Sequence, residues 1–307
     1  MSLLDKTNLL ITPNAVKAGK LYSVIPASGT GDCTVVRNTT ATRVISSGLI
    51  ESIAVNVPRL NYDSVGGNPS VLVEPQITNL INYSQDFAQS YWNKGACSII
   101  SNSTTSPSGI VNADKLVENT ASARHILNKD GNFFQNNLNY SFSVFVKPNG
   151  RDIVRFQNKL NNGTFINTYF NLSTGVISSN AATSKIENIG GYFRISHLFN
   201  SDTGTSGNNA IISPAITSGV EIYTGNGVSG IFVWGAQLAI GDVSSYIPTT
   251  NAAVTRNADV ITVAPPTGTV KITTTFSDNT TQIITSIPAL FTVPEGLIKQ
   301  VLMQSSL

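Results

Sequence analysis

The sequence has few charged side chains. Asp, Glu, Lys and Arg make up 12% of its 307 residues, about half of the usual share of roughly 25%. The 19 basic and 17 acidic residues leave a net charge of +2, and they are scattered along the chain rather than gathered in a basic stripe. This balance argues against a nucleic-acid partner, a coiled coil and a charged disordered tail.

Cysteine and long apolar runs are scarce as well. Cys33 and Cys97 are the two cysteines, and we expect two unlinked thiols in a chain made in a reducing cytoplasm. No window approaches 18 apolar residues, which predicts no transmembrane helix and no membrane partner. The first residues lack a basic region followed by an apolar one, so no signal peptide is expected.

Small polar residues take the place of charges. Ser, Thr and Asn account for 98 of the 307 residues, while 41% of the residues are hydrophobic. The hydrophobic share is sufficient for a sizeable core, and the chain length suits one large or two ordinary domains. We therefore expect a folded protein whose surface is covered by hydroxyl and amide groups.

The hydrophobic pattern predicts strands almost throughout. Residues 140–146 alternate apolar and small polar side chains, whereas residues 230–238 are apolar on both faces, as in a buried central strand. Turn signals recur every 8–12 residues, which is typical of a sandwich or barrel. Residues 85–94 and 113–119 are the two places where a turn or two of helix is expected.

Two hairpins stand out in this pattern. Asn-Asn-Gly at 161–163 predicts a turn between strands in 151–160 and 164–172. Ser-Asp-Asn-Thr at 277–280 predicts another between 271–276 and 282–287. A lone hairpin is marginal in water, so the second one must pack on the sandwich or on another subunit.

The predicted fold is all-β. It consists of an antiparallel, jelly-roll-like β-sandwich, a β-rich N-terminal segment and a C-terminal β-hairpin region. We place the boundaries at residues 1–75, 76–260 and 261–307, because a Gly/Pro-rich turn closes the first segment and Pro265-Pro266 resists both helix and central strand.

Signals for catalysis are weak. The two histidines, His125 and His197, lie outside any recognisable motif, and no nucleophile elbow, zinc-protease motif or phosphate-binding loop occurs. We expect His197 to be a hydrogen-bonded strand residue and His125 a surface strand residue. Asp114 and Glu118 are four residues apart and could share a helical face, but a glycosidase needs a defined carboxylate pair. We predict no enzyme, no catalytic residue, no cofactor and no metal.

Aromatic residues give the one hint of a ligand. An aromatic ring stacks on the apolar face of a sugar while neighbouring amides bind its hydroxyls. Tyr91, Trp92 and Asn93 form such a cluster in a turn-like segment, and Tyr192 follows two glycines. These four residues are the candidate glycan contacts. For Trp92, core packing or a subunit contact is favoured over glycan stacking, and Trp234 is expected in the core.

Several segments resemble a recurrent domain of tailed-bacteriophage fibre proteins. The most specific are residues 230–238 and the run from Ser-Tyr-Ile-Pro-Thr-Thr at 245–250 to Thr-Arg-Asn-Ala-Asp at 255–259. The terminal segments resemble virion fibre proteins of phages that infect Bacteroidetes, the crAss-like group included. The other matching segments are 37–43, 48–51, 57–62, 72–87, 91–94, 113–116, 140–147, 169–175, 191–196 and 273–301.

The resemblance implies a fold, a location and partners. It implies a carbohydrate-binding-module-like β-sandwich, located in the virion and assembled as a symmetric oligomer, most often a homotrimer, with capsid or tail proteins as further partners. It assigns no ligand residues.

Three functions remain open. The first is a capsid head fibre that binds host or mucosal glycans. The second is a tail-associated glycan-binding receptor module, which requires an exposed aromatic residue and convergent amides. A polysaccharide depolymerase ranks behind both, because it requires two acids about 5–10 Å apart.

Overall fold

The computed structural model describes residues 6–26, 32–63, 67–179 and 183–306, and it confirms the all-β fold. The chain forms two compact units: residues 78–255 form one, and residues 1–77 together with 256–307 form the other. No α-helix occurs within the described ranges, and Pro13–Ala15 form a 3-10 turn. No helix there is long and apolar enough to cross a bilayer.

Residues 78–255 form the sandwich from two six-stranded antiparallel sheets. Sheet I contains, in spatial order, β10 (Asn93–Gly95), β14 (Ile126–Gly131), β21 (Asn208–Ala215), β16 (Ile153–Lys159), β17 (Phe165–Asn171) and β18 (Ile177–Ser179). Sheet II contains β11 (Cys97–Thr105), β12 (Val111–Glu118), β23 (Gly230–Ile240), β15 (Asn139–Asn149), β20 (Tyr192–Asn200) and β19 (Thr183–Ile189). The short pair β13 (Ser122–Ala123) and β22 (Tyr223–Thr224) lies outside both sheets.

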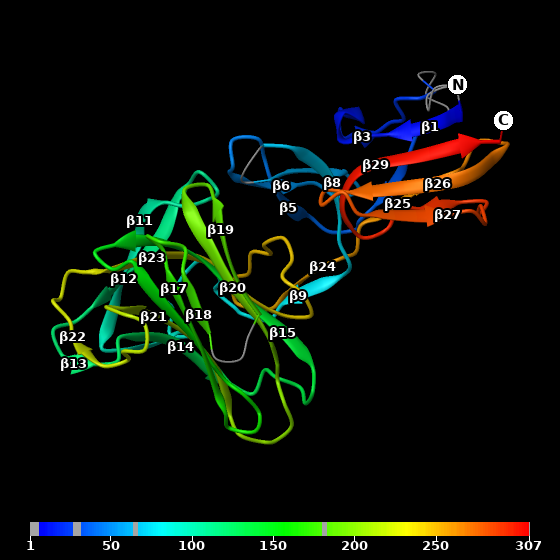
Figure 1. Ribbon diagram of the computed structural model, residues 1–307. Helices are drawn as coiled ribbons and strands as arrows, with labels where there is room; N and C mark the ends of the chain where they lie inside the picture. The colour runs from blue at the N-terminus through cyan, green and yellow to red at the C-terminus, as the bar shows by residue number, and fades with distance from the viewer. Residues whose placement is uncertain (1–5, 27–31, 64–66, 180–182, 307) are drawn as a thin grey trace. The chain divides into compact units, whose positions relative to one another are not determined.

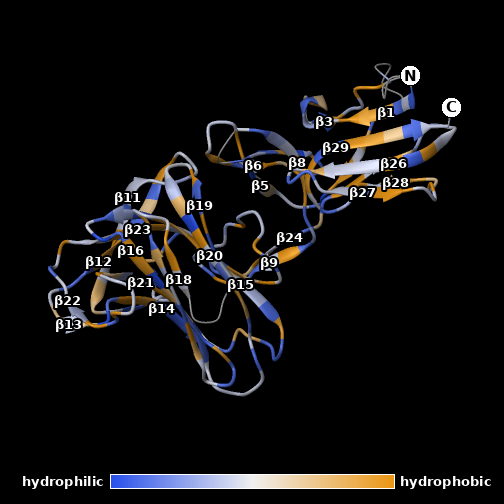
Figure 2. Ribbon diagram, in the orientation of Figure 1, coloured by the Kyte–Doolittle hydropathy of each residue, from blue (hydrophilic) through white to orange (hydrophobic). Residues whose placement is uncertain are grey.

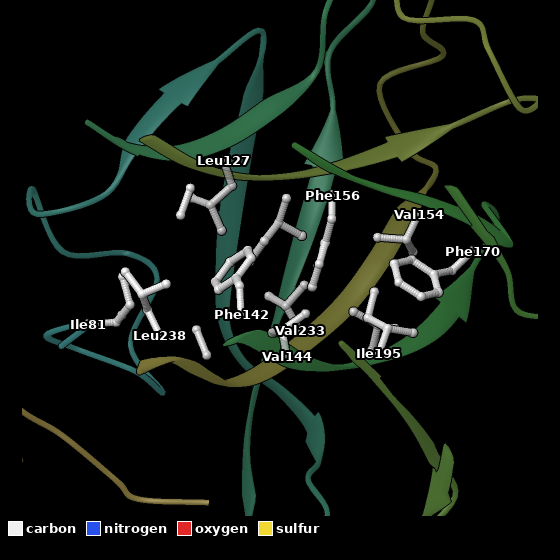
Figure 3. Packing of buried hydrophobic residues seen from close by; sticks show 14 of the residues in the cluster. Ile81, Leu127, Phe142, Val144, Val154, Phe156, Phe170, Ile195, Val233 and Leu238 are labelled. Carbon is white, nitrogen blue, oxygen red and sulfur yellow. The ribbon is translucent and has the colours of Figure 1, made fainter. Parts of the chain in front are cut away.

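The sandwich core is built by alternate residues of the two sheets. Phe156 of sheet I packs against Phe142 of sheet II with ring centroids 4.6 Å apart. Figure 3 shows these rings together with Val144, Val154 and Leu238 filling the space between strands. Because side chains alternate along a strand, the neighbours of these residues in sequence face outward.

The hairpin predicted around residues 161–163 is confirmed. β16 and β17 pair along their whole length, from Ile153 opposite Asn171 to Lys159 opposite Phe165. Gly163 adopts a positive φ of 89°, a conformation that glycine reaches at little cost. The side-chain oxygen of Asn162 accepts the amide N–H of Thr164 at 2.8 Å and closes the turn.

The two expected helical turns are absent, and both expectations were wrong. Residues 85–94 form bends and turns leading into β10, and residues 113–118 belong to β12. β12 is buried on both faces, with Asp114 and Glu118 each 1% exposed. A strand with apolar and polar residues buried on both sides loses its two-residue alternation, which explains the misleading pattern.

The second unit centres on a six-stranded antiparallel sheet. Its order is β27 (Thr281–Ile284), β26 (Thr269–Phe276), β29 (Gly296–Ser305), β8 (Pro69–Val73) and β7 (Arg59–Tyr62), and β1 (Thr7–Ile11) also pairs with β29 (Figure 1). Its core includes Leu9, Val71, Ile272, Val301 and Met303. In Figure 2 hydrophilic and hydrophobic colours are interspersed along the strands of both units.

Shorter strands complete the secondary structure. β25 (Val260–Val263) pairs with β4 and β28, β5 pairs with β6, and β2 pairs with β3. The chain passes from one unit to the other within β9 and β24. The remaining bounds are β2 Val16–Lys17, β3 Lys20–Leu21, β4 Thr34–Val36, β5 Ala41–Val44, β6 Ile50–Ile53, β9 Ile77–Asn79, β24 Val254–Arg256 and β28 Phe291–Thr292.

The hairpin predicted after residue 270 forms as β26 and β27, but its packing partner differs from both expectations. β26 pairs with β29, which in turn pairs with β1 and β8 near the other end of the chain. The segments predicted as 1–75 and 261–307 therefore belong to one unit rather than two. The sandwich occupies residues 78–255, where residues 76–260 were predicted.

A buried group of charges joins the two halves of this second unit. Asp259 accepts a hydrogen bond from Arg37 at 2.8 Å, and it also bonds Arg59 and the backbone N–H of Glu74. Arg256 lies 3.3 Å from the Glu74 carboxylate. Arg37, Arg59 and Arg256 are each at most 1% exposed. Arg256 and Asp259 are the last charged residues of the segment 245–259, which resembles fibre proteins. In this structure both residues take part in the buried ion pairs of the second unit.

Candidate functional site

The structure places Trp92 in the sandwich core. Its side chain is 1% exposed. The indole N–H donates to the backbone carbonyl of Tyr83 at 3.1 Å, and the ring lies 5.1 Å from that of Phe87. No face of the ring is open to a sugar. Trp92, a candidate glycan contact in the sequence, is therefore a core residue and not a ligand contact.

Tyr192 is enclosed in the same way. The residue is 1% exposed, and its hydroxyl donates to the carbonyl of Thr105 at 3.0 Å. Burial raises the pKa of this hydroxyl to about 12. Tyr192 therefore supports the fold and offers no surface for a ligand, which also corrects its predicted role.

Tyr91 and Asn93 lie nearer the surface. Tyr91 is half-buried, and the ammonium of Lys129 lies 4.5 Å from its ring centroid, where a sugar ring would stack. Asn93 is exposed and donates from its side-chain amide to Asp130 at 3.0 Å. Of the four predicted contacts, Asn93 alone combines exposure with a polar group on a sheet surface.

Asn93 belongs to a row of amides across the outer face of sheet I. The strand registers place Asn93 opposite Asn128, and Gln157 opposite Asn167, with Ile211 between the two pairs. The adjacent row on these strands contains Leu127, Ile212 and Phe156, which face the core. Since side chains alternate, the amide row points outward.

Hydrogen bonds fix the orientation of these amides. The Gln157 amide donates to Asn167 at 2.8 Å and accepts from the Arg124 guanidinium at 2.7 Å. At the other end of the row, Asn128 and Asn93 both donate to the Asp130 carboxylate. Gln157 and Asn128 are 3% and 8% exposed, whereas Asn93 is exposed and Asn167 is half-buried. The buried amides therefore hold Asn167 and Asn93 in fixed orientations, as recognition of a sugar's hydroxyl groups requires.

Aromatic side chains flank the amide row on β17. Phe165 and Tyr169 share the outer face with Asn167, because the residues that alternate with them along the strand, Ile166, Thr168 and Phe170, face the other side and are buried. Phe165 is 44% exposed, whereas Tyr169 is 8% exposed and packs with Ile153 and Ala215. The outer face thus brings an exposed aromatic ring next to oriented amides.

Three charged groups border the Gln157 end of the row. The Glu221 carboxylate lies 2.7 Å from Arg155 and 3.1 Å from Arg124. The side chains of Arg124 and Glu221 are 37% and 35% exposed, while Arg155 is buried. Two guanidinium groups therefore share one carboxylate at this border.

The outer face of sheet II differs in character. Phe145 and Trp234 are buried there with ring centroids 5.3 Å apart, and Tyr246 covers them at 5.9 and 4.7 Å. The segment around Tyr246 and Ile247 belongs to the same unit and returns over this face. Trp234 is therefore a buried residue, as expected.

Both histidines are enclosed. His197 is fully buried, with Nε2 2.5 Å from the side-chain oxygen of Asn158, and burial lowers its pKa to about 3. This confirms the expected hydrogen-bonded strand residue. His125 was expected at the surface, but it is also fully buried, with its ring 4.6 Å from that of Tyr223.

The acids of β12 are tied into the fold as well. Asp114 accepts the backbone N–H groups of Phe87 and Asn102, although burial still raises its pKa. Glu118 is also buried, but hydrogen bonds from Arg151 and Tyr223 outweigh this and lower its pKa. In the described ranges no three His, Cys, Asp or Glu side chains gather as a metal site would require.

Seven residues of the site were not predicted from the sequence: Phe165, Gln157, Asn167, Tyr169, Arg124, Arg155 and Glu221. A signal was present for the strand residues: Arg155, Gln157 and Lys159 alternate with Val154 and Phe156 along β16. Such alternation marks the outward face of a strand.

Comparisons with known proteins add little to this geometry. No protein-family model matches the sequence, and no curated protein matches it. Among solved structures, similarity extends to the CBM22-1 and GH10 modules of endo-1,4-beta-D-xylanase 10B from Clostridium thermocellum, complexed with xylohexaose. The identity is 15% and the TM-score 0.33, and the match covers 57% of this chain and 30% of that chain. A similarity this low carries no argument about the site.

Proposed function

We propose that this chain is a non-catalytic structural protein of a bacteriophage virion, a head fibre that binds glycans through the outer face of sheet I. The observation that carries the glycan-binding part is the exposed Phe165 ring beside the half-buried amide of Asn167, which the buried Gln157 holds in place by a hydrogen bond. The virion part rests on the sequence resemblance to fibre proteins.

The chemistry of this face suits a sugar better than an apolar ligand. A pyranose presents an apolar face to an aromatic ring and hydroxyl groups at its edges, and each hydroxyl both donates and accepts. Amide side chains match this because each also carries donors and an acceptor.

A binding measurement on the full chain tests the glycan-binding part. We expect binding on an array of bacterial and mucosal glycans, followed by calorimetry with the strongest oligosaccharide. Phe165→Ala should weaken that binding about tenfold, since losing one stacked ring costs about 1.4 kcal/mol. Asn167→Ala should weaken it to a similar degree.

Ile240→Ala is the matched control. Ile240 is 43% exposed and belongs to the same unit, but it lies in β23 of sheet II. Its substitution should leave binding unchanged. Equal loss in the Ile240 and Phe165 variants, or no binding to any glycan, would remove the outer face of sheet I as the binding site.

Particle labelling tests the virion part. Antibodies to the full chain should decorate purified phage particles, and light scattering should give the mass of a homotrimer. Labelling confined to the tail would favour the tail-associated receptor module, which uses the same glycan-binding face. Unlabelled particles together with a monomeric protein would refute a fibre role of either kind.

A further inference from the structure

The border of the amide row carries an excess of positive charge. The register and contacts of sheet I place Arg124, Arg155 and Lys159 on its outer side, together with the carboxylates of Asp130 and Glu221, so these five described residues carry a net charge of +1. Asp130 accepts hydrogen bonds from Asn93 and Asn128 at the opposite end of the row. Glu221 is therefore the acid shared by the two arginines.

Among the described residues, the guanidinium N–H groups of Arg155 lack hydrogen-bond acceptors in this arrangement. Its guanidinium is 99% buried, and the 2.7 Å contact to Glu221 is not aligned as a hydrogen bond. Within the part of the chain that the structure describes, Nε, Nη1 and Nη2 all lack a hydrogen-bond acceptor. A buried cation of this kind is costly, and its positive field is weakly screened.

Arg124 connects this buried charge to the surface. Its side chain is 37% exposed, contacts Glu221, and donates to Gln157 in the amide row. An anion that approaches the row at this end meets an accessible guanidinium, with the second guanidinium behind it. Guanidinium groups bind carboxylates well because their paired N–H groups match the two oxygens.

We propose that this face selects glycans that carry a carboxylate, and that Arg124, backed by Arg155, binds that carboxylate. The inference rests on the proposed glycan-binding function and names its substrate class. A uronic or sialic acid unit would bring the local charge of two arginines and Glu221 from +1 to zero. A neutral sugar would leave the excess charge in place.

The test uses pairs of glycans that differ in the carboxylate alone. Oligomers of galacturonate, guluronate, mannuronate and hyaluronan, and sialylated oligosaccharides, are compared with their carboxyl-reduced, neutral counterparts on the full chain. We expect at least one acidic member to bind at least tenfold more tightly than its counterpart. Its affinity should fall as NaCl rises from 50 to 500 mM, because ions screen exposed charges.

Two variants identify the groups involved. Arg124→Gln should abolish the preference for the acidic member, so that the ratio of its affinity to that of the neutral counterpart falls to about one. Because Arg124 also donates to Gln157, the test is this ratio and not the affinity for the neutral member alone. Glu221→Gln should tighten binding of the acidic member several-fold, since it removes a carboxylate that competes for the same guanidinium groups. Arg43→Gln is the matched control: it breaks an exposed Arg–Glu pair in the other unit and should change neither affinity.

The outcomes separate the two proposals. Equal binding of acidic and neutral members, or a preference that survives Arg124→Gln, overturns the carboxylate selectivity and leaves glycan binding standing. Weaker binding of the acidic member by Glu221→Gln also overturns it, because Glu221 would then support the site. Failure to bind any member of the pairs, or any other glycan, overturns both.

Discussion

Removing the charge of Asp259 should destabilise the unit formed by residues 1–77 and 256–307. In Asp259→Asn, Arg37, Arg59 and Arg256 would remain buried. Arg37 would lose its ion pair with Asp259, while Arg59 and Arg256 would keep Glu74. Breaking a buried ion pair from one side typically costs about 3–5 kcal/mol, because the other charge stays buried without compensation. We expect a loss of about 3 kcal/mol or more.

Urea unfolding of the full chain measures this loss. Both tryptophans, Trp92 and Trp234, lie in the sandwich, so their fluorescence reports that unit, whereas circular dichroism reports all strands. With a slope of about 1.5 kcal/mol per M of urea, the dichroism transition of the Asp259 unit should move down by about 2 M. The fluorescence transition should move less.

An exposed ion pair in the same unit provides the control. Glu51 pairs with Arg43 at 2.9 Å, and their side chains are 46% and 21% exposed. Glu51→Gln should cost less than about 1 kcal/mol. If Asp259→Asn cost no more than this control, the buried network would contribute little to the stability of the unit, and the reasoning would be refuted.

Three further predictions concern the sandwich and the thiols. Because burial lowers the pKa of His197 to about 3 from an ordinary value near 6.5, its contribution to stability should be complete above about pH 6.5 and fall by about 1.4 kcal/mol per pH unit between about 6.5 and 3. His197→Gln should flatten that slope in urea titrations followed by fluorescence, and an unchanged slope would assign it to other groups. Trp92→Ala should cost about 3–5 kcal/mol in unfolding experiments because it empties a core position, and a loss below 1 kcal/mol would contradict this placement. Burial raises the pKa of Cys33 and Cys97 to about 12, so both thiols should react with a disulfide reagent at pH 8 far more slowly in the native chain than in guanidinium, and equal rates would show that they are accessible.

Local patterns predicted the parts of the fold that local interactions determine. The β16–β17 hairpin follows from a glycine at a turn position and from alternating side chains on both sides. Residues 230–238 were recognised as a buried central strand, and β23 lies inside sheet II. In each case the relevant partners are near in sequence, or burial is visible in the strand's own composition.

Other features depend on residues far apart in sequence. The pairing of β1 with β29 places Ile11 opposite Val301. Neither strand has a local sequence pattern that identifies the other as its partner. Trp92 and Phe165 show the same difficulty for the site: both are aromatic residues near asparagines, yet one is 1% exposed and the other 44%. The difference arises from which sheet face each residue meets, and this follows from the register rather than from composition.

The pairing of β1 with β29 has a consequence for synthesis on the ribosome. The sandwich is complete in sequence at residue 255, whereas the central sheet of the other unit needs β26 and β29 from the last part of the chain. Domains generally fold as units while the chain grows. The sandwich should therefore fold first, at a stage when β29, the pairing partner of β1 and β8, has not yet been synthesised. A chaperone that binds nascent chains would therefore act chiefly on β1 and β8, whose edges are still unpaired with β29 at that stage.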